Sequence, residues 1–225
     1  MKKEDNFRVV PTIGEGIYLP MDVSEILRLE YYKVKYLMDT FWLEYTFGEK
    51  RNKAINFFSL IEFYTYYHLR EGGYSSKYIK NFHQNLSKSM DTRYPFATIK
   101  VVEPKLKKHK TRNSKIWYEY MGELMRDDRI NQPTISSFVK PFLQRVVFGE
   151  NLLAQKFYPF KHTKNVVVDP LHQFGKPVIE GTNLQTKTIY RLHEAGETTG
   201  NICILYDISE MQVHDAIRLH TRKVA

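Results

Sequence analysis

Near the start of the chain, apolar residues recur at helical spacing in two short runs. From Asp22 onward they share one face of a helix, and Asp22 with Glu25 three positions later is typical of a capping box. After a break at residues 28–30, helical spacing resumes over 31–41. The pattern predicts two short helices around a tight turn.

The next segments favour a small β-wing and two more helices. Residues 41–58 alternate in polarity around the turn-like run at 48–53, which predicts a two-stranded wing with a basic tip. Helical patterns follow at 59–70, closed by Gly72 and Gly73, and at 75–90. Residues 92–115 hold Pro95, Pro104 and a run of lysines, so we expect a linker or a long exposed loop there.

The second half of the chain changes character twice. Residues 116–160 are rich in large apolar side chains with helical spacing over 134–155, and they predict a helical bridge. The β-branched run at 166–168 and the segment 175–182 predict two short strands, and helices are expected at 186–194, 198–206 and 209–221. The expected fold is mainly α, with an N-terminal winged helix-turn-helix, the bridge, and a C-terminal three-helix domain with a short β-hairpin. The expected domains are 10–99, 100–160 and 161–225.

Composition bounds the class of protein. A chain of 225 residues that is 42% hydrophobic can bury more than one small core. The opening residues lack the apolar run of a secretory signal, and no stretch approaches the roughly 20 apolar residues that span a bilayer. Cys203 is the single cysteine, so an internal disulfide and a cysteine-rich zinc site are excluded. We expect a cytoplasmic protein that does not associate with a membrane.

The net charge of +9 favours polyanionic partners. The excess concentrates in residues 100–115, where Glu103 is the single acidic residue among seven basic ones. This stretch is either an arm that contacts phosphates or a solvated loop.

Two resemblances to known families add to this interpretation. Residues 166–220 resemble the family called domain of unknown function four hundred and thirty-three, found in VapB-like antitoxins. The resemblance rests on VVVDP at 166–170, GKPVIEGT at 175–182, and then Gly196, Ile202, Leu205, Tyr206, Val213, Ala216 and Ile217 in the family's order. Asn183 stands where that family usually has arginine.

Residues 17–37 look like the helix-turn-helix of MerR-type regulators, with Ser24 in the place of a small residue, and residues 57–80 look like the helix pair that follows their wing. The combination resembles antitoxins of type II toxin-antitoxin systems. That resemblance implies a PIN-like ribonuclease toxin as partner and operator DNA as the target of autoregulation by a homodimer. A stand-alone MerR-like transcriptional regulator with a ligand- or protein-binding C-terminal domain is the alternative, and a scaffold that binds only proteins is a third.

Candidate DNA-binding residues follow from the helix-turn-helix, whose second helix enters the major groove, and from the basic tip of the wing. They are Arg28, Tyr31, Tyr32, Lys33, Lys35, Lys50, Arg51 and Lys53. Tyr36 either joins them or packs into the core of the module.

Candidate interface residues of the C-terminal domain are apolar, because a two-stranded piece is marginal alone and must complete either a core or a dimer. They are Val167, Val168, Val178, Ile179 and Leu184, and Leu205 belongs to the same apolar set. Residues 116–160 are the candidate for contact with the toxin.

Enzymatic signals are weak. None of the eight histidines is followed by another four residues later, so the helical zinc pair of metalloproteases is absent. Gly14 and Gly16 begin a GxGxxG pattern, but Leu19 occupies the third glycine position. Asp127 and Asp128 are adjacent and would diverge on a helix. We expect no catalytic residues, no metal and no cofactor.

Overall fold

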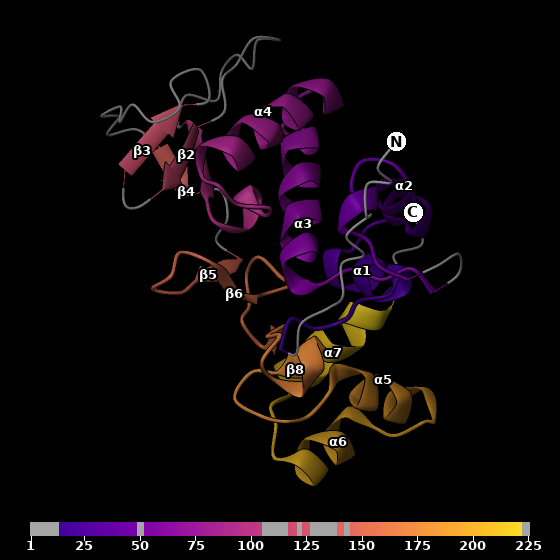
Figure 1. Cartoon of the computed structure of the whole chain (residues 1–225). Coiled ribbons are helices and arrows are strands. Elements are labelled where there is room, and N and C mark those ends of the chain that lie inside the picture. Colours follow the sequence, from indigo (N-terminus) through magenta and orange to yellow (C-terminus); the bar gives the residue numbers. More distant parts are fainter. Residues whose placement is uncertain are drawn as a thin grey trace. The chain divides into compact units, whose positions relative to one another are not determined.

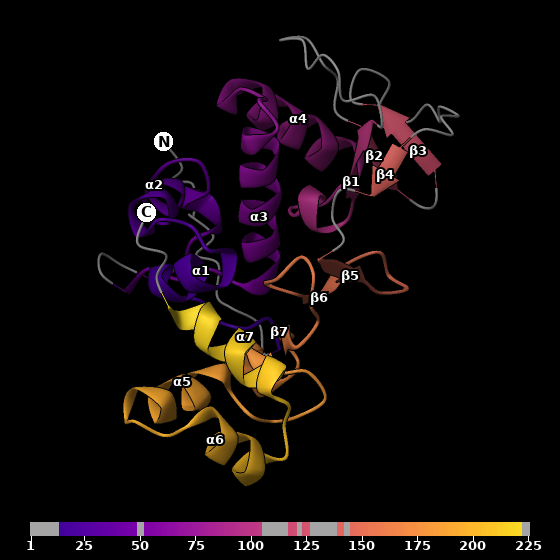
Figure 2. The same cartoon turned by 180° about the vertical axis from the view of Figure 1, so that it is seen from behind.

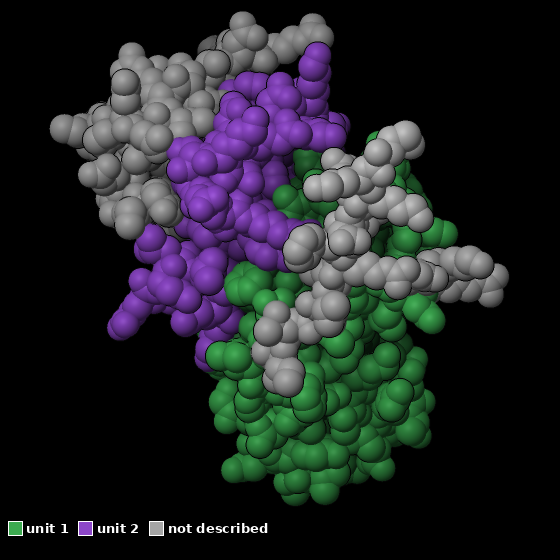
Figure 3. Space-filling view, in the orientation of Figure 1, with its two compact units in different colours: residues 1–60, 158–225 green, residues 61–157 purple. Residues whose placement is uncertain are grey.

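The computed structural model describes residues 14–48, 52–104, 117–120, 123–126, 139–141 and 145–221. The chain forms two compact units, one from residues 1–60 with 158–225 and the other from residues 61–157 (Figure 3). The first unit therefore unites the two ends of the sequence. The expected division into three successive domains stays a prediction.

The first unit opens with the predicted helix pair, α1 (Pro20–Leu27) and α2 (Tyr31–Asp39) (Figure 1). Between them Arg28 has a left-handed conformation with φ 57°, and the Ser24 hydroxyl donates a 2.6 Å hydrogen bond to the Leu29 carbonyl oxygen. The tight turn is thus confirmed. The apolar faces of both helices are buried, at Val23, Ile26, Leu27, Val34, Leu37 and Met38.

The start of α1 differs from the prediction. Asp22 does not precede the helix but lies within its first turn, where its carboxylate accepts a 3.0 Å hydrogen bond from the backbone N–H of Leu19. The helix begins earlier because Pro20, whose fixed φ suits the first turn and whose missing N–H costs nothing there, can start it.

The predicted wing is not confirmed. Residues 43–45 form a 3-10 helix that buries Tyr45, and two isolated antiparallel bridges, Tyr18 with Ile55 and Phe47 with Ala54, stand in place of two described strands. Trp42 is fully buried beside this turn. At the start of 41–58, the alternating pattern wrongly predicted a strand. The aromatic side chains there are buried on a helical turn.

The C-terminal part of the first unit matches its prediction closely. Strands β7 (Val166–Val167) and β8 (Val178–Ile179) pair antiparallel, and α5 (Thr186–Glu194), α6 (Thr199–Tyr206) and α7 (Glu210–His220) follow. Thr198 and Ser209, the first residues of two predicted helices, each precede the helix and cap it with a side-chain oxygen. The core combines strand and helix residues: Phe160, Val166, Ile179, Ile189, Ile202, Ile208, Val213, Ala216 and Leu219.

The second unit takes most of α3 (Phe57–Glu71), all of α4 (Ser76–Ser89) and several strands. Antiparallel strands form a sheet in the order β3 (Glu123–Arg126), β2 (Trp117–Tyr120), β1 (Lys100–Pro104), β4 (Val139–Pro141), and β5 (Val146–Phe148) pairs with β6 (Ala154–Phe157) (Figure 2). The carboxylate of Glu62, fully buried, lies 2.8 Å from the His83 imidazole and accepts a hydrogen bond from the Phe96 N–H. A polar link therefore joins α3, α4 and the segment after α4.

The helical bridge predicted for 116–160 is wrong, since the described residues of that stretch contain β2 to β6. Aromatic and β-branched residues favour β-strands. Pairing between segments far apart in the sequence therefore outweighed the local helical spacing of the apolar residues. The linker predicted over 92–115 is also wrong in part. Pro95, Phe96 and Ala97 are buried, and Lys100–Pro104 is a central strand of the sheet. The remainder of the lysine-rich stretch lies outside the described residues.

Two glycines of the GKPVIEGT segment offer a matched test of packing. Both have positive φ, 78° at Gly175 and 80° at Gly181, but a Cβ at Gly175 would lie 2.1 Å from the buried Tyr18 hydroxyl, whereas a Cβ at Gly181 meets nothing within 4 Å. We expect Gly175→Ala to lower the free energy of unfolding by about 3 kcal/mol, through backbone strain and a clash with Tyr18. Gly181→Ala, the control, carries the strain alone and costs about 1 kcal/mol. Urea unfolding measures both, and equal losses would contradict the clash.

Candidate nucleic-acid interface

Helix α2 carries four of the eight predicted DNA-binding residues. Tyr31, Tyr32, Lys35 and Tyr36 are exposed, and Lys33 is half-buried with its ammonium 5.8 Å from the Tyr32 ring centre. The inner face, with Val34, fixes the helix on the module's core. The structure thus brings these candidates together on one solvent-facing helix surface.

Tyr36 belongs to the same surface. Of the two positions expected for it, core or outer face, the structure gives the outer face, with 62% of the residue exposed. Tyrosine hydroxyls and lysine ammonium groups projecting from one helix can donate hydrogen bonds to base edges and phosphates.

The wing candidates are dispersed. Lys53 forms an ion pair with Asp39 at the end of α2, which opposes its charge and ties the segment after the turn to the helix. Lys50 and Arg51 lie outside the described residues.

Arg28 turns toward the C-terminal domain instead of the outer face of α2. Its guanidinium donates a 2.7 Å hydrogen bond to the carbonyl oxygen of Arg218 on α7 and lies 5.6 Å from the centre of the Phe160 ring. The Arg218 guanidinium lies 4.8 Å from the same ring. These contacts occupy Arg28 within the first unit, and its contact with DNA stays a prediction.

A chain of hydrogen bonds continues this junction between α1 and the C-terminal helices. His220 is 2.9 Å from the Glu25 carboxylate through Nδ1 and 2.9 Å from the Thr186 hydroxyl through Nε2. Its side chain is 5% exposed, and each ring nitrogen lies within hydrogen-bond distance of a protein group. A second ion pair, between Lys176 and Asp22 at 3.2 Å, lies beside it. We call the contacts of Arg28, Glu25 and Asp22 with the C-terminal domain the α1 dock.

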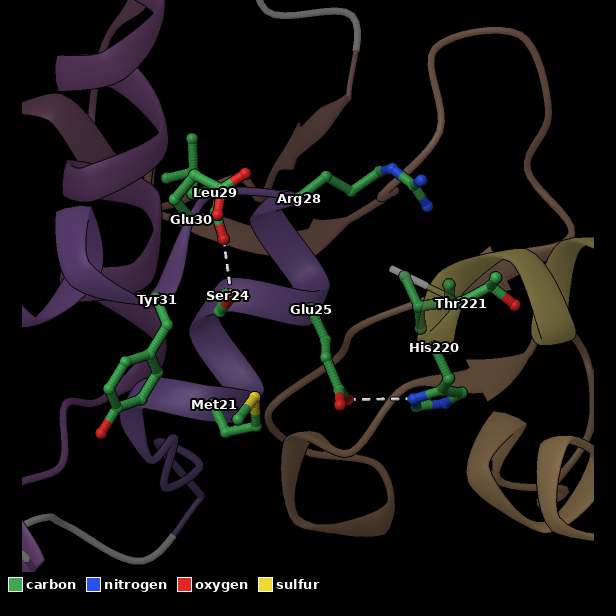
Figure 4. A pocket seen from close by; sticks show the side chains of 10 residues that line it. Met21, Ser24, Glu25, Arg28, Leu29, Glu30, Tyr31, His220 and Thr221 are labelled. Carbon is green, nitrogen blue, oxygen red and sulfur yellow. Dashed lines mark hydrogen bonds and ion pairs between the residues drawn. The ribbon is translucent and has the colours of Figure 1, made fainter. Parts of the chain in front are cut away.

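A cavity of about 320 Å³ adjoins the α1 dock. It is lined by Met21, Ser24, Glu25, Arg28, Leu29, Glu30, Tyr31, Leu219, His220 and Thr221. Figure 4 shows the side chains of Glu25 and His220 pointing toward each other at its wall. The lining mixes carboxylates, an imidazole and apolar groups, so the cavity can accept a small polar molecule.

Tyr18 lies deep in the same unit. Burial raises the pKa of its phenol far above the usual value, and the nearby carboxylates of Asp169 and Asp22 raise it further. Its hydroxyl is neutral and has no hydrogen-bond partner in the described part of the chain. The phenol packs between Gly16 and Gly175, so its role is to pin the entering chain against the C-terminal domain.

The candidate interface residues of the C-terminal domain are largely internal. Val167, Val168, Val178 and Ile179 are at most 4% exposed, and Leu184 is half-buried against the same core. Leu205, from the same apolar set, is 67% exposed on α6. The chain's own core therefore accounts for the burial of the first four.

Sequence reasoning missed the α1 dock. Glu25 and His220 are 195 positions apart, and no local sequence pattern in either segment predicts the contact. Of the exposed apolar residues of α6, the sequence analysis named Leu205 as part of an apolar set but did not name Ile204.

Within the part of the chain that the structure describes, no three His, Cys, Asp or Glu side chains gather as a metal site requires. The same residues include no helix both long and apolar enough to cross a membrane. The expectation that the protein is not an enzyme stays a prediction.

Comparison with known families matches residues 166–219 to the family described as a protein of unknown function (DUF433). The match starts at β7 and ends on α7, so it covers the strand pair and the three helices but neither Phe160 nor His220. Its first strand and three helices are those that the sequence predicts.

Among solved structures, the chain resembles the crystal structure of Rv2018 from Mycobacterium tuberculosis, with a TM-score of 0.64 and 16% sequence identity. The alignment covers 94% of this chain and all of that one, so the two share a fold over nearly their full lengths. No curated protein matches the sequence.

Replacing His220 tests the α1 dock. We expect His220→Ala to lower the free energy of unfolding by about 2 to 3 kcal/mol, because it leaves the buried Thr186 hydroxyl and the Glu25 carboxylate without their shared partner. His214→Ala, an exposed position on the same helix, is the control and should change it by less than about 0.5 kcal/mol. Thermal and urea unfolding measure the difference; similar small losses for both would show that the dock contributes little.

Proposed function

We propose that this protein binds duplex DNA through the outer face of α2 and acts as the antitoxin of a type II toxin-antitoxin system. The observation that carries the DNA-binding part is the exposed face of α2, where tyrosines and lysines project from a helix held by a tight turn. Such a helix fits the width of the major groove.

The charge on this face is modest and shapes the expected mode of binding. Lys33 and Lys35 are its cations, while Glu30 is exposed at its start and Asp39 is paired with Lys53. One copy would make few phosphate contacts, and two copies on a palindromic site would double them. A homodimer is therefore part of the proposal.

The antitoxin part rests on the combination of modules. The C-terminal domain matches the DUF433 family and contacts the helix pair through α1. In sequence the same domain resembles those found in VapB-like antitoxins. The partner that this resemblance implies is a PIN-like ribonuclease toxin, and the DNA target is the operator of the protein's own operon.

Lysine substitutions on α2 test DNA binding. We expect Lys33→Ala and Lys35→Ala each to weaken binding to the protein's own promoter about fivefold, near 1 kcal/mol, and to reduce the slope of log K against log salt by about 1 per copy bound. Lys88→Ala, an exposed lysine on α4, is the matched control and should leave both quantities unchanged. Electrophoretic shifts over a salt series give the slope. Promoter binding that survives loss of both lysines at every salt concentration would refute this interface.

Co-expression tests the antitoxin part. We expect the chain and the product of the adjoining open reading frame to purify as a stable complex that shifts the operon's promoter DNA. A promoter shift by this chain alone, with no complex, would remove the toxin from the proposal and leave a regulator.

That outcome would favour a second candidate function, a stand-alone regulator with a ligand site. The cavity of about 320 Å³ beside α1 supports it, because a molecule bound there would contact the turn that positions α2. Stabilisation of the chain by small metabolites in a thermal-shift screen, lost in Glu25→Ala, would distinguish this function from the antitoxin.

A further inference from the structure

Helix α6 is polar in its first turn, at Thr199 and Asn201, and apolar in its second half. Its Ile202 is buried at 1% exposure, yet Ile204 is 84% and Leu205 is 67% exposed on the same helix. Large apolar side chains on a helix are normally enclosed by protein. Here one side packs on α7 and the domain core while the other faces solvent.

A further exposed apolar residue lies at the start of α7. Met211, in the first turn of α7, is 64% exposed, and a turn of three residues joins α7 to the end of α6. Figure 1 places α6 at the edge of the C-terminal helices. We call Ile204, Leu205 and Met211 the α6 patch. Exposed apolar groups that gather inside a polar rim mark protein-binding surfaces.

Asp207 and Glu210, which lie in the sequence between Leu205 and Met211, give the α6 patch an acidic rim. Between Arg191 and Arg218 the chain has no lysine or arginine, but it has Glu194, Glu197, Asp207, Glu210 and Asp215, and all except Asp215 are exposed. Among the described residues, no cation pairs with Asp207 or Glu210. The chain as a whole has a net charge of +9, whereas this segment is negatively charged.

That charge selects the kind of occupant. Phosphates of a nucleic acid would be repelled. A second copy related by a twofold axis would bring the same acidic groups of both chains together, which like-charge repulsion opposes. A protein surface with an apolar centre and a rim of lysine and arginine would complement both features.

We propose that the α6 patch is the docking surface for a basic partner protein and, resting on the proposed function, that this partner is the ribonuclease toxin. An enzyme that cleaves RNA needs a positive surface to hold the phosphate backbone. The acidic rim of the α6 patch would cover that surface, so docking and inhibition would follow from one contact.

The stretch 116–160, expected from the sequence to contact the toxin, is less suited. Several of its described apolar side chains are buried within the chain: Phe157 is fully buried, and Val146, Tyr158 and Phe160 are at most 7% exposed, while Val147 is 37% exposed. The α6 patch has apolar area still open to a partner.

The decisive experiment compares variants in the co-purification with the product of the adjoining open reading frame. We expect Ile204→Asp with Leu205→Asp to weaken the complex at least about tenfold, since interface anchors dominate affinity. Both residues are exposed, so the variant should keep the wild-type melting temperature and promoter shift. Leu171→Asp, equally exposed at 83% in the same domain, is the matched control and should bind as the wild type does.

The rim is tested separately by neutralisation. Asp207→Asn with Glu210→Gln keeps the shape, and Asn tolerates the left-handed backbone of Asp207. We expect slower association, about threefold to tenfold at low salt, and a weaker dependence on ionic strength.

Each outcome has one meaning. Loss of the complex in the α6 variant alone supports the docking surface. Equal binding by wild type, α6 variant and Leu171→Asp overturns it and leaves the antitoxin function standing. A wild-type chain that forms no complex removes the antitoxin function itself. A change from dimer to monomer in the α6 variant, measured by sedimentation without partner, assigns the patch to self-association and overturns the inference.

Discussion

The imidazole of His220 is the group on which the first unit depends most. It joins a carboxylate on α1 to a hydroxyl at the start of α5, so one side chain at the end of α7 connects the helix pair with the C-terminal domain. Buried and bonded on both nitrogens, it allows little sliding between these elements, because any shift would leave polar groups unsatisfied. Arg28 fixes the same junction from the turn between α1 and α2. The orientation of the exposed face of α2 is therefore set by the C-terminal domain.

Much of the secondary structure could be predicted where local signals agreed with the final packing. Serine and threonine marked the starts of α4, α6 and α7, glycines the ends of α3 and α5, and β-branched residues the β7 and β8 pair. The region of 116–160 could not be predicted, because its strands are defined by pairing with segments far along the chain, such as β1 with β4. The spacing of apolar residues within that region predicted a helix instead of strands.

The candidate site, too, was predictable from local sequence patterns only in part. The solvent-facing residues of α2 follow from the spacing of its buried ones, so Tyr32 and Lys35 were predictable. The commitment of Arg28 to Phe160 and of Lys53 to Asp39 depends on tertiary contacts that no local pattern encodes. The first unit presents surfaces of opposite character, cationic and aromatic on α2 and acidic and apolar on α6. Under the proposed functions, this separation of sign would keep a nucleic acid and a basic protein from competing for one surface.

The composition of the first unit from both ends of the chain has a consequence for synthesis. When residues 1–60 leave the ribosome, the groups that complete their packing, Phe160, Arg218 and His220, have not been made. At translation rates of about 5–20 residues per second, the chain up to His220 takes roughly 8 to 32 seconds longer to make. During that interval α1 lacks its dock, and Tyr18 lacks the wall that Gly175 provides. A chain that terminates early would carry the residues of α2 without the support that orients them, so only complete chains would present that face in its final form.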